Sequence, residues 1–117
     1  MRRALRLWIA LLAPAAAFCQ VDKSCPGTAL EHPPKLLGND DAFRKAVRAE
    51  AYTGRVVFRL TITDTGEVQD PVITSPARLD SVNAVKDRIR EWRFCPAVQF
   101  NRYATVKAQF DIEVRPE

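Results

Sequence analysis

An Asp-Thr-Gly triplet is the first feature of this sequence that could carry catalysis. Asp64-Thr65-Gly66 is the tripeptide of aspartic proteases, whose chemistry needs two aspartates that share a proton. The sequence holds one copy, so a protease would have to form a dimer. The triplet also suits a hairpin turn, because its glycine is free to adopt positive φ. It lies between two alternating apolar and polar stretches, and we interpret it as a turn.

The cysteines are the second feature with possible chemistry. Cys95 would be a reactive thiol only beside a base that lowers its pKa, and His32 lies far away in a proline-rich stretch. If Cys19 is removed with a signal peptide, Cys25 and Cys95 remain as an even pair. In an exported chain such a pair favours a disulfide over two free thiols. Two distant cysteines and one histidine do not have zinc-site spacing, so we expect no metal, no cofactor and no enzyme activity.

The positive charge of the chain is concentrated at its start. Arg2, Arg3 and Arg6 supply three of the four net positive charges, which leaves +1 for the remainder. A nearly neutral domain lacks the electrostatic footprint of a nucleic-acid-binding protein. A later basic group, Arg88 to Arg93, is interleaved with acidic residues and is interpreted as a solvated helix face.

Residues 1–19 have the pattern of a secretory signal peptide. The arginines precede an apolar run over residues 7–13, which is too short for a comfortable membrane span. The small-x-small rule allows cleavage after Ala17 or after Cys19, and lipidation of Cys19 is an alternative that the bulky Phe18 disfavours. We therefore expect a periplasmic protein without a stable membrane span.

The elements of the mature chain begin after a leader, residues 20–38, that is rich in proline and turn signals. Asn39 or Asp40 can cap a helix that ends near Tyr52. Alternation over residues 56–63, with one apolar face and one largely polar face, predicts a strand. A second strand, Glu67 to Thr74, contains Pro71, which cannot donate a ladder hydrogen bond and so indicates an edge strand or a bulge.

The second half of the chain predicts one more helix and one more strand. Asp80 can cap a helix from Ser81 to about Arg93, whose apolar stripe makes Trp92 a core residue. Phe94 is likewise predicted to pack in the core rather than to contact a partner from an exposed position. The most regular alternation runs from Tyr103 to Val114 and predicts the last strand.

These elements predict an α+β fold. The hairpin makes the first two strands antiparallel, and the third strand completes an antiparallel sheet if it pairs with the first. The sheet order is then second–first–third (2-1-3), with both helices packed on one face. Pro71 falls on one edge, and the last strand forms the other edge.

Several motifs carry a resemblance to a known family. They are Gly54-Arg55-Val56-Val57-Phe58, Asp64-Thr65-Gly66-Glu67-Val68, Leu79-Asp80, Trp92-Arg93-Phe94-Cys95-Pro96-Ala97 and the alternating terminal strand. Over residues 54–114 the chain resembles the C-terminal domain of the TonB family of energy transducers. The resemblance implies the fold just predicted, within a domain spanning residues 39–117. It also implies a domain that grips a short segment of an outer-membrane receptor, linked to transport.

The expected partner is a protein or peptide segment that adds a strand beside the last one. An edge strand presents unpaired N–H and C=O groups, so the backbone supplies affinity and alternate side chains supply selectivity. The predicted partner-binding residues are Tyr103, Thr105, Lys107, Gln109, Asp111 and Glu113. The same edge could instead pair with a second copy as a homodimer.

The sequence also departs from a full transducer. About 20 residues separate the expected cleavage site from the domain, which reach about 70 Å at most when extended. We therefore expect a stand-alone exported relative. A structural or envelope-assembly component with no transport role is the alternative.

Overall fold

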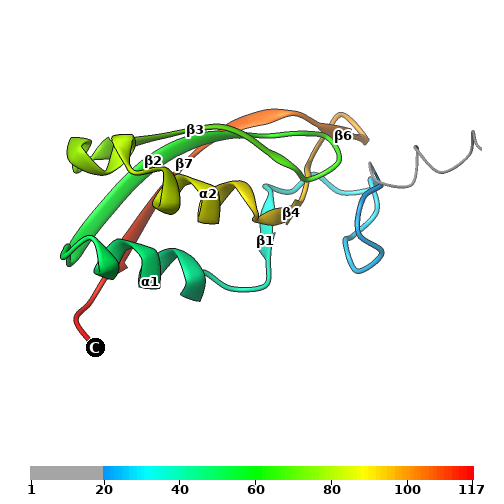
Figure 1. Ribbon diagram of the computed structural model, residues 1–117. Helices are drawn as coiled ribbons and strands as arrows, with labels where there is room; N and C mark the ends of the chain where they lie inside the picture. The colour runs from blue at the N-terminus through cyan, green and yellow to red at the C-terminus, as the bar shows by residue number, and fades with distance from the viewer. Residues whose placement is uncertain (1–19) are drawn as a thin grey trace, which may run out of the picture.

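A three-stranded antiparallel sheet is the centre of the structure, a computed structural model that describes residues 20–117 (Figure 1). Its strands are β2 (Gly54–Ile62), β3 (Val68–Ser75) and β7 (Val106–Val114), in the order β3-β2-β7. The predicted order of these three strands is confirmed. The predicted signal peptide, with its cleavage sites and Cys19, lies outside the described residues.

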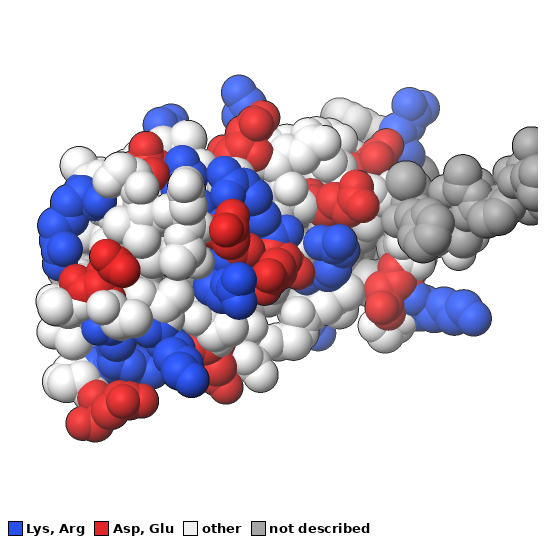
Figure 2. Space-filling view, in the orientation of Figure 1, with Lys and Arg blue, Asp and Glu red and all other residues white. Residues whose placement is uncertain are grey.

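Two α-helices, α1 (Asp41–Ala49) and α2 (Asn83–Arg90), lie on the same face of this sheet (Figure 1). Each helix buries one stripe, for example Phe43 and Val47 from α1, against the inward side chains of the strands. Figure 2 shows basic and acidic side chains interspersed over this side of the molecule. On α2 the basic group is paired locally, Arg88 with Glu91 and Arg90 with Asp87.

An aromatic cluster joins the helices to the sheet. Trp92 is only 7% exposed, and its ring centroid lies 5.7 Å from those of Phe43 and Phe58. Phe110 of β7 stacks on Phe58 of β2 at 5.6 Å, and it lies 5.6 Å from Phe94. The core positions predicted for Trp92 and Phe94 are confirmed. Because Phe110 belongs to this cluster, β7 is fixed to the core along its inward face.

The predicted second helix is wrong at both ends. Residues Ala77–Ser81 form a separate 3-10 turn, η2, and α2 begins at Asn83 after Val82. Asp80 does not cap the helix, because its Oδ1 accepts a hydrogen bond from the Ile73 N–H at 2.9 Å. The helix ends at Arg90, and the chain then extends into a strand.

Two small sheets were not predicted. β1 (Lys35–Leu37) pairs antiparallel with β4 (Arg93–Cys95), and β5 (Ala97–Gln99) pairs with β6 (Arg102–Ala104). The leader therefore packs against the domain. The expected continuous strand from residue 103 to residue 114 is wrong, because the chain leaves β6 and breaks at Thr105 before β7 begins.

The turn predicted at Asp64-Thr65-Gly66 is confirmed and joins β2 to β3. Gly66 has φ +90°, and a Cβ built there would lie 1.9 Å from the carbonyl oxygen of Phe94. The Phe94 N–H donates to the Gly66 carbonyl at 2.9 Å. Glycine is required here for both conformation and space.

Candidate strand-binding edge

The sheet has two outer edges, and the β3 edge is protected. Pro71 has no N–H to offer, and it lies where the register shifts between Arg59↔Val72 and Thr61↔Gln69, so the predicted edge position and bulge are both present. The next outward donor, the N–H of Ile73, is taken by Asp80. A bulge, a proline and a side-chain cap are devices that prevent strand pairing.

Asp80 is well suited to this capping role. The backbone hydrogen bond from Ile73 lowers the pKa of Asp80 from its ordinary value, and Lys86, 3.2 Å away, lowers it further. The carboxylate therefore stays charged and remains a strong acceptor for the strand. α2 and η2 also pack beside β3 and cover this edge.

The β7 edge is different, and the alternation of the ladder shows which of its groups face outward. The Val57 carbonyl accepts a hydrogen bond from Thr74 of β3 at 3.1 Å, so odd-numbered residues of β2 face β3. Val57 lies opposite Asp111 in β7. In an antiparallel ladder, residues alternate in the side to which they direct both backbone groups. Odd-numbered residues of β7 therefore direct N–H and C=O away from β2, and the Glu113 carbonyl does accept from the Arg44 guanidinium of α1.

The open part of this edge is short and has defined ends. At its C-terminal end, Arg44 occupies the Glu113 carbonyl and Arg48 donates to the Arg115 carbonyl at 3.1 Å. Between these contacts and the start of β7, the outward residues are Lys107, Gln109 and Asp111. Within residues 20–117, no hydrogen bond to their outward backbone groups is found. Three N–H and three C=O groups are thus available for another strand.

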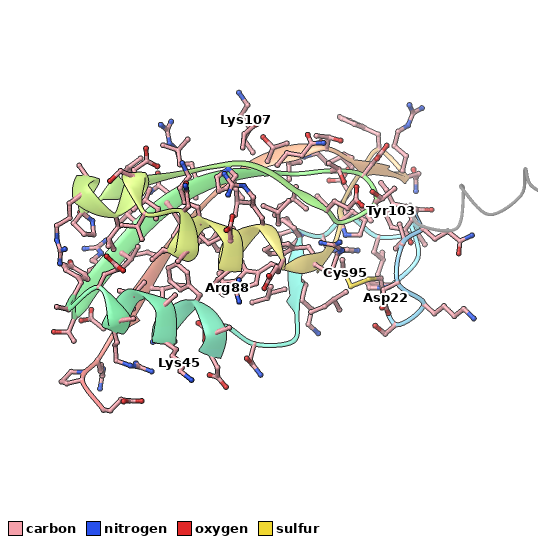
Figure 3. The ribbon with its side chains drawn as sticks, in the orientation of Figure 1. Asp22, Lys45, Arg88, Cys95, Tyr103 and Lys107 are labelled. Carbon is pink, nitrogen blue, oxygen red and sulfur yellow. A yellow bond between two sulfur atoms is a disulfide. The ribbon has the colours of Figure 1, made fainter. Side chains whose placement is uncertain are left out.

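The side chains of these residues lie on the solvent face of the sheet. Lys107, Gln109, Asp111 and Glu113 are all exposed, and Figure 3 shows Lys107 projecting away from the sheet. Asp111 forms an ion pair with Arg55 of β2, and this hydrogen-bonded contact raises the pKa of Arg55. Both groups are largely exposed, so the pair contributes little to stability.

A shallow hollow of about 360 Å³ adjoins these side chains on the solvent face. It is lined by all three strands, with Arg59 and Thr61 from β2, Val72 from β3, and Lys107 and Gln109 from β7. A strand added beside β7 would place alternate side chains on this face. The hollow therefore lies within reach of the groups that would provide selectivity.

Two of the predicted edge residues lie elsewhere. Tyr103 belongs to β6, and its hydroxyl donates to the Pro26 carbonyl of the leader at 3.0 Å. Thr105 lies at the break between β6 and β7, where its Oγ1 accepts from the Asp64 N–H at 3.1 Å. Both are held by contacts within the chain and are not part of the β7 edge. Continuous alternation from residue 103 to residue 114 concealed this break.

The residues that could have carried catalysis are found in a disulfide and in a turn. Cys25 and Cys95 form a disulfide, as predicted, and Figure 3 shows Cys95 at the same end of the molecule as Tyr103 and Asp22. Asp64 lies exposed in the β2–β3 turn. In the described part of the chain there is no group of three or more metal-ligating side chains, and no helix is long and apolar enough to cross a membrane.

The fold is similar to that of a solved structure. This is the solution NMR structure of the Pseudomonas aeruginosa TonB C-terminal domain, with a TM-score of 0.51 and 24% sequence identity. The match covers 78% of this chain and 94% of that one. Neither the protein-family models nor the curated proteins gave a match. The chain thus has a TonB-like fold, in agreement with the resemblance carried by its motifs.

Proposed function

We propose that this protein is a periplasmic binding module that takes up an extended protein segment as an additional strand beside β7. One observation carries the proposal, namely the contrast between the two edges of the sheet. The β3 edge is blocked by Pro71 and by the Asp80–Ile73 hydrogen bond, whereas β7 presents its outward groups from Lys107 to Asp111. Proteins generally protect exposed sheet edges. An edge that stays open opposite a protected one therefore suggests that it binds another strand.

The rigidity of β7 supports the same function. Nine consecutive residue pairs join it to β2 without a register shift, and Phe110 anchors it to the aromatic core. A visiting segment would therefore meet a template that is already ordered, which reduces the entropic cost of binding. Lys107, Gln109, Asp111 and Glu113 remain the predicted selectivity residues.

The proposal also includes the compartment of the protein and the source of its partner. The signal-peptide pattern of residues 1–19 and the Cys25–Cys95 disulfide both favour an oxidising compartment outside the cytoplasm. The motifs resembling the TonB family favour a segment of an outer-membrane receptor as the partner. Binding rather than catalysis is the proposed activity, since Cys95 is in the disulfide and Asp64 lies in an exposed turn.

Site-specific photocrosslinking in bacterial envelope extracts tests this function. A photoreactive phenylalanine analogue replaces Gln109 on the β7 edge, and a matched variant carries it at Gln69, which is exposed on the protected β3 strand. We expect a discrete crosslinked partner from position 109 and none from position 69. Equal crosslinking from both positions, or none from position 109, would contradict binding at β7. A crosslink to a second copy would instead identify a homodimer.

A further inference from the structure

A second hollow, of about 410 Å³, opens at the N-terminal end of β7. Its walls are leader residues 31–34, strand β5 and the first three residues of β7. Its β7 residues are Val106, Lys107 and Ala108, which begin the strand. It includes no residue of β2. The hollow therefore lies off the open side of β7, in the path of any strand added there.

The walls of this hollow are mainly apolar. Its apolar lining residues are Pro33 and Pro34 of the leader, Ala97 and Val98 of β5, and Val106 and Ala108 of β7. Glu31, His32, Gln99 and Lys107 supply the polar part of the lining. Prolines have no N–H, so the leader side offers few donors with which to continue a ladder. Such a wall stops strand pairing and favours contact with an apolar side chain.

Contacts within the chain hold the leader wall in place. The Val98 N–H donates to the His32 carbonyl at 3.0 Å, and the Phe100 N–H donates to Glu31 Oε2 at 3.1 Å. The Cys25–Cys95 disulfide precedes this wall, and the β1–β4 pairing follows it. The leader is thus fixed on both sides of residues 31–34, and the hollow is already formed in the free protein.

We propose that this hollow receives an apolar side chain at one end of the segment that pairs with β7, and so fixes the register of that segment. The inference rests on the proposed strand addition, because the occupant is the end of the same visiting strand. The hollow is continuous with the open edge through Lys107 and Ala108. Two contacts would then recognise a bound segment. Its backbone would pair with residues 107–111, and one of its apolar side chains would lie in the hollow beside the leader.

Binding of designed peptides tests the inference. The probes are fluorescein-labelled heptapeptides of alternating valine and threonine, with Leu, Ala or Asp as the guest at the first or the last position. The opposite end carries a lysine tail for solubility. We expect Leu to bind about tenfold more tightly than Ala at one of the two ends, with Asp weaker still, because part of the Leu side chain leaves water.

Two matched variants locate the effect. Gln99→Trp fills the hollow from an exposed position of β5, whereas Arg102→Trp places the same side chain on its partner residue in β6, which does not line the hollow. We expect Gln99→Trp to remove the preference for Leu, and Arg102→Trp to retain it. Circular dichroism verifies that both variants are folded.

The outcomes separate this inference from the proposed function. Peptides that bind equally well with all three guests, and that lose affinity in a Gln109→Pro variant, would overturn the apolar subsite while leaving strand addition intact. Binding that is insensitive to Gln109→Pro would overturn strand addition itself. An absence of binding by every peptide would overturn both.

Discussion

Replacement of Gln109 by proline should weaken partner binding strongly while leaving the protein folded. Gln109 is the middle one of the three outward residues of β7, and its N–H does not bond to β2. Proline removes that N–H and places its ring where a visiting backbone would lie. Because prolines are tolerated on the free side of edge strands, we expect the free energy of unfolding to fall by less than about 1 kcal/mol.

The expected loss of affinity follows from the hydrogen bonds of the open stretch. A net contribution of about 0.5–1.5 kcal/mol is typical of each bond. The substitution removes one bond and displaces its neighbour, so we expect a loss of about 2 kcal/mol, or roughly 30-fold in Kd. The matched control is Ala108→Pro. Its N–H faces β2, so this variant should lose a ladder bond, leave its partner carbonyl unpaired, and lose more than about 1 kcal/mol of stability.

Fluorescence anisotropy with the labelled heptapeptides gives the Kd, and urea unfolding gives the stability of each variant. A folded Gln109→Pro protein that binds with unchanged affinity would refute pairing at the β7 edge. A Gln109→Pro protein as unstable as Ala108→Pro would refute the assignment of outward and inward residues.

Three further predictions concern contacts elsewhere in the domain. Gly66→Ala should reduce stability by more than about 2 kcal/mol in urea unfolding, because Gly66 has φ +90° and its added Cβ would meet the Phe94 carbonyl; a loss below about 0.5 kcal/mol would contradict that crowding. The double variant Cys25→Ser, Cys95→Ser should lose about 4 kcal/mol, since the disulfide closes a sequence separation of 70 residues, and equal stability of the oxidised and variant proteins would be evidence against it. Asp80→Asn should destabilise the protein at pH 7, and the loss should become smaller as the pH is lowered below 3.8. The folded pKa of Asp80 is lowered below 3.8, so its contribution is present above that pH and disappears as pH falls through the folded pKa; a loss that does not change with pH would contradict a charged cap on Ile73.

The main sheet could be predicted from sequence because its strands are long and carry a simple pattern. β7 alternates strictly over its nine residues, β2 alternates with the exception of Val57, and Pro71 indicated an edge strand or a bulge. The hairpin then left one antiparallel arrangement for the third strand. The open edge of β7 followed from that arrangement.

The smaller elements could not be predicted because nothing local specifies them. β1, β4, β5 and β6 have three residues each, too few for a period to show, and β1 and β4 are far apart in sequence. The break at Thr105 preserves the alternation on both sides. It depends on a hydrogen bond from Asp64, which is distant in the sequence. Aspartate is a residue type that commonly caps helices, but in the folded chain Asp80 accepts a hydrogen bond from the Ile73 N–H.

Amide hydrogen exchange along β7 measures the open edge most directly. In the free protein we expect fast exchange at Lys107, Gln109 and Asp111, and slow exchange at Ala108 and Phe110, whose N–H groups bond to β2. Addition of a binding peptide should slow the three fast amides. Uniform protection in the free protein, or fast amides that stay unprotected in the complex, would contradict binding by strand addition.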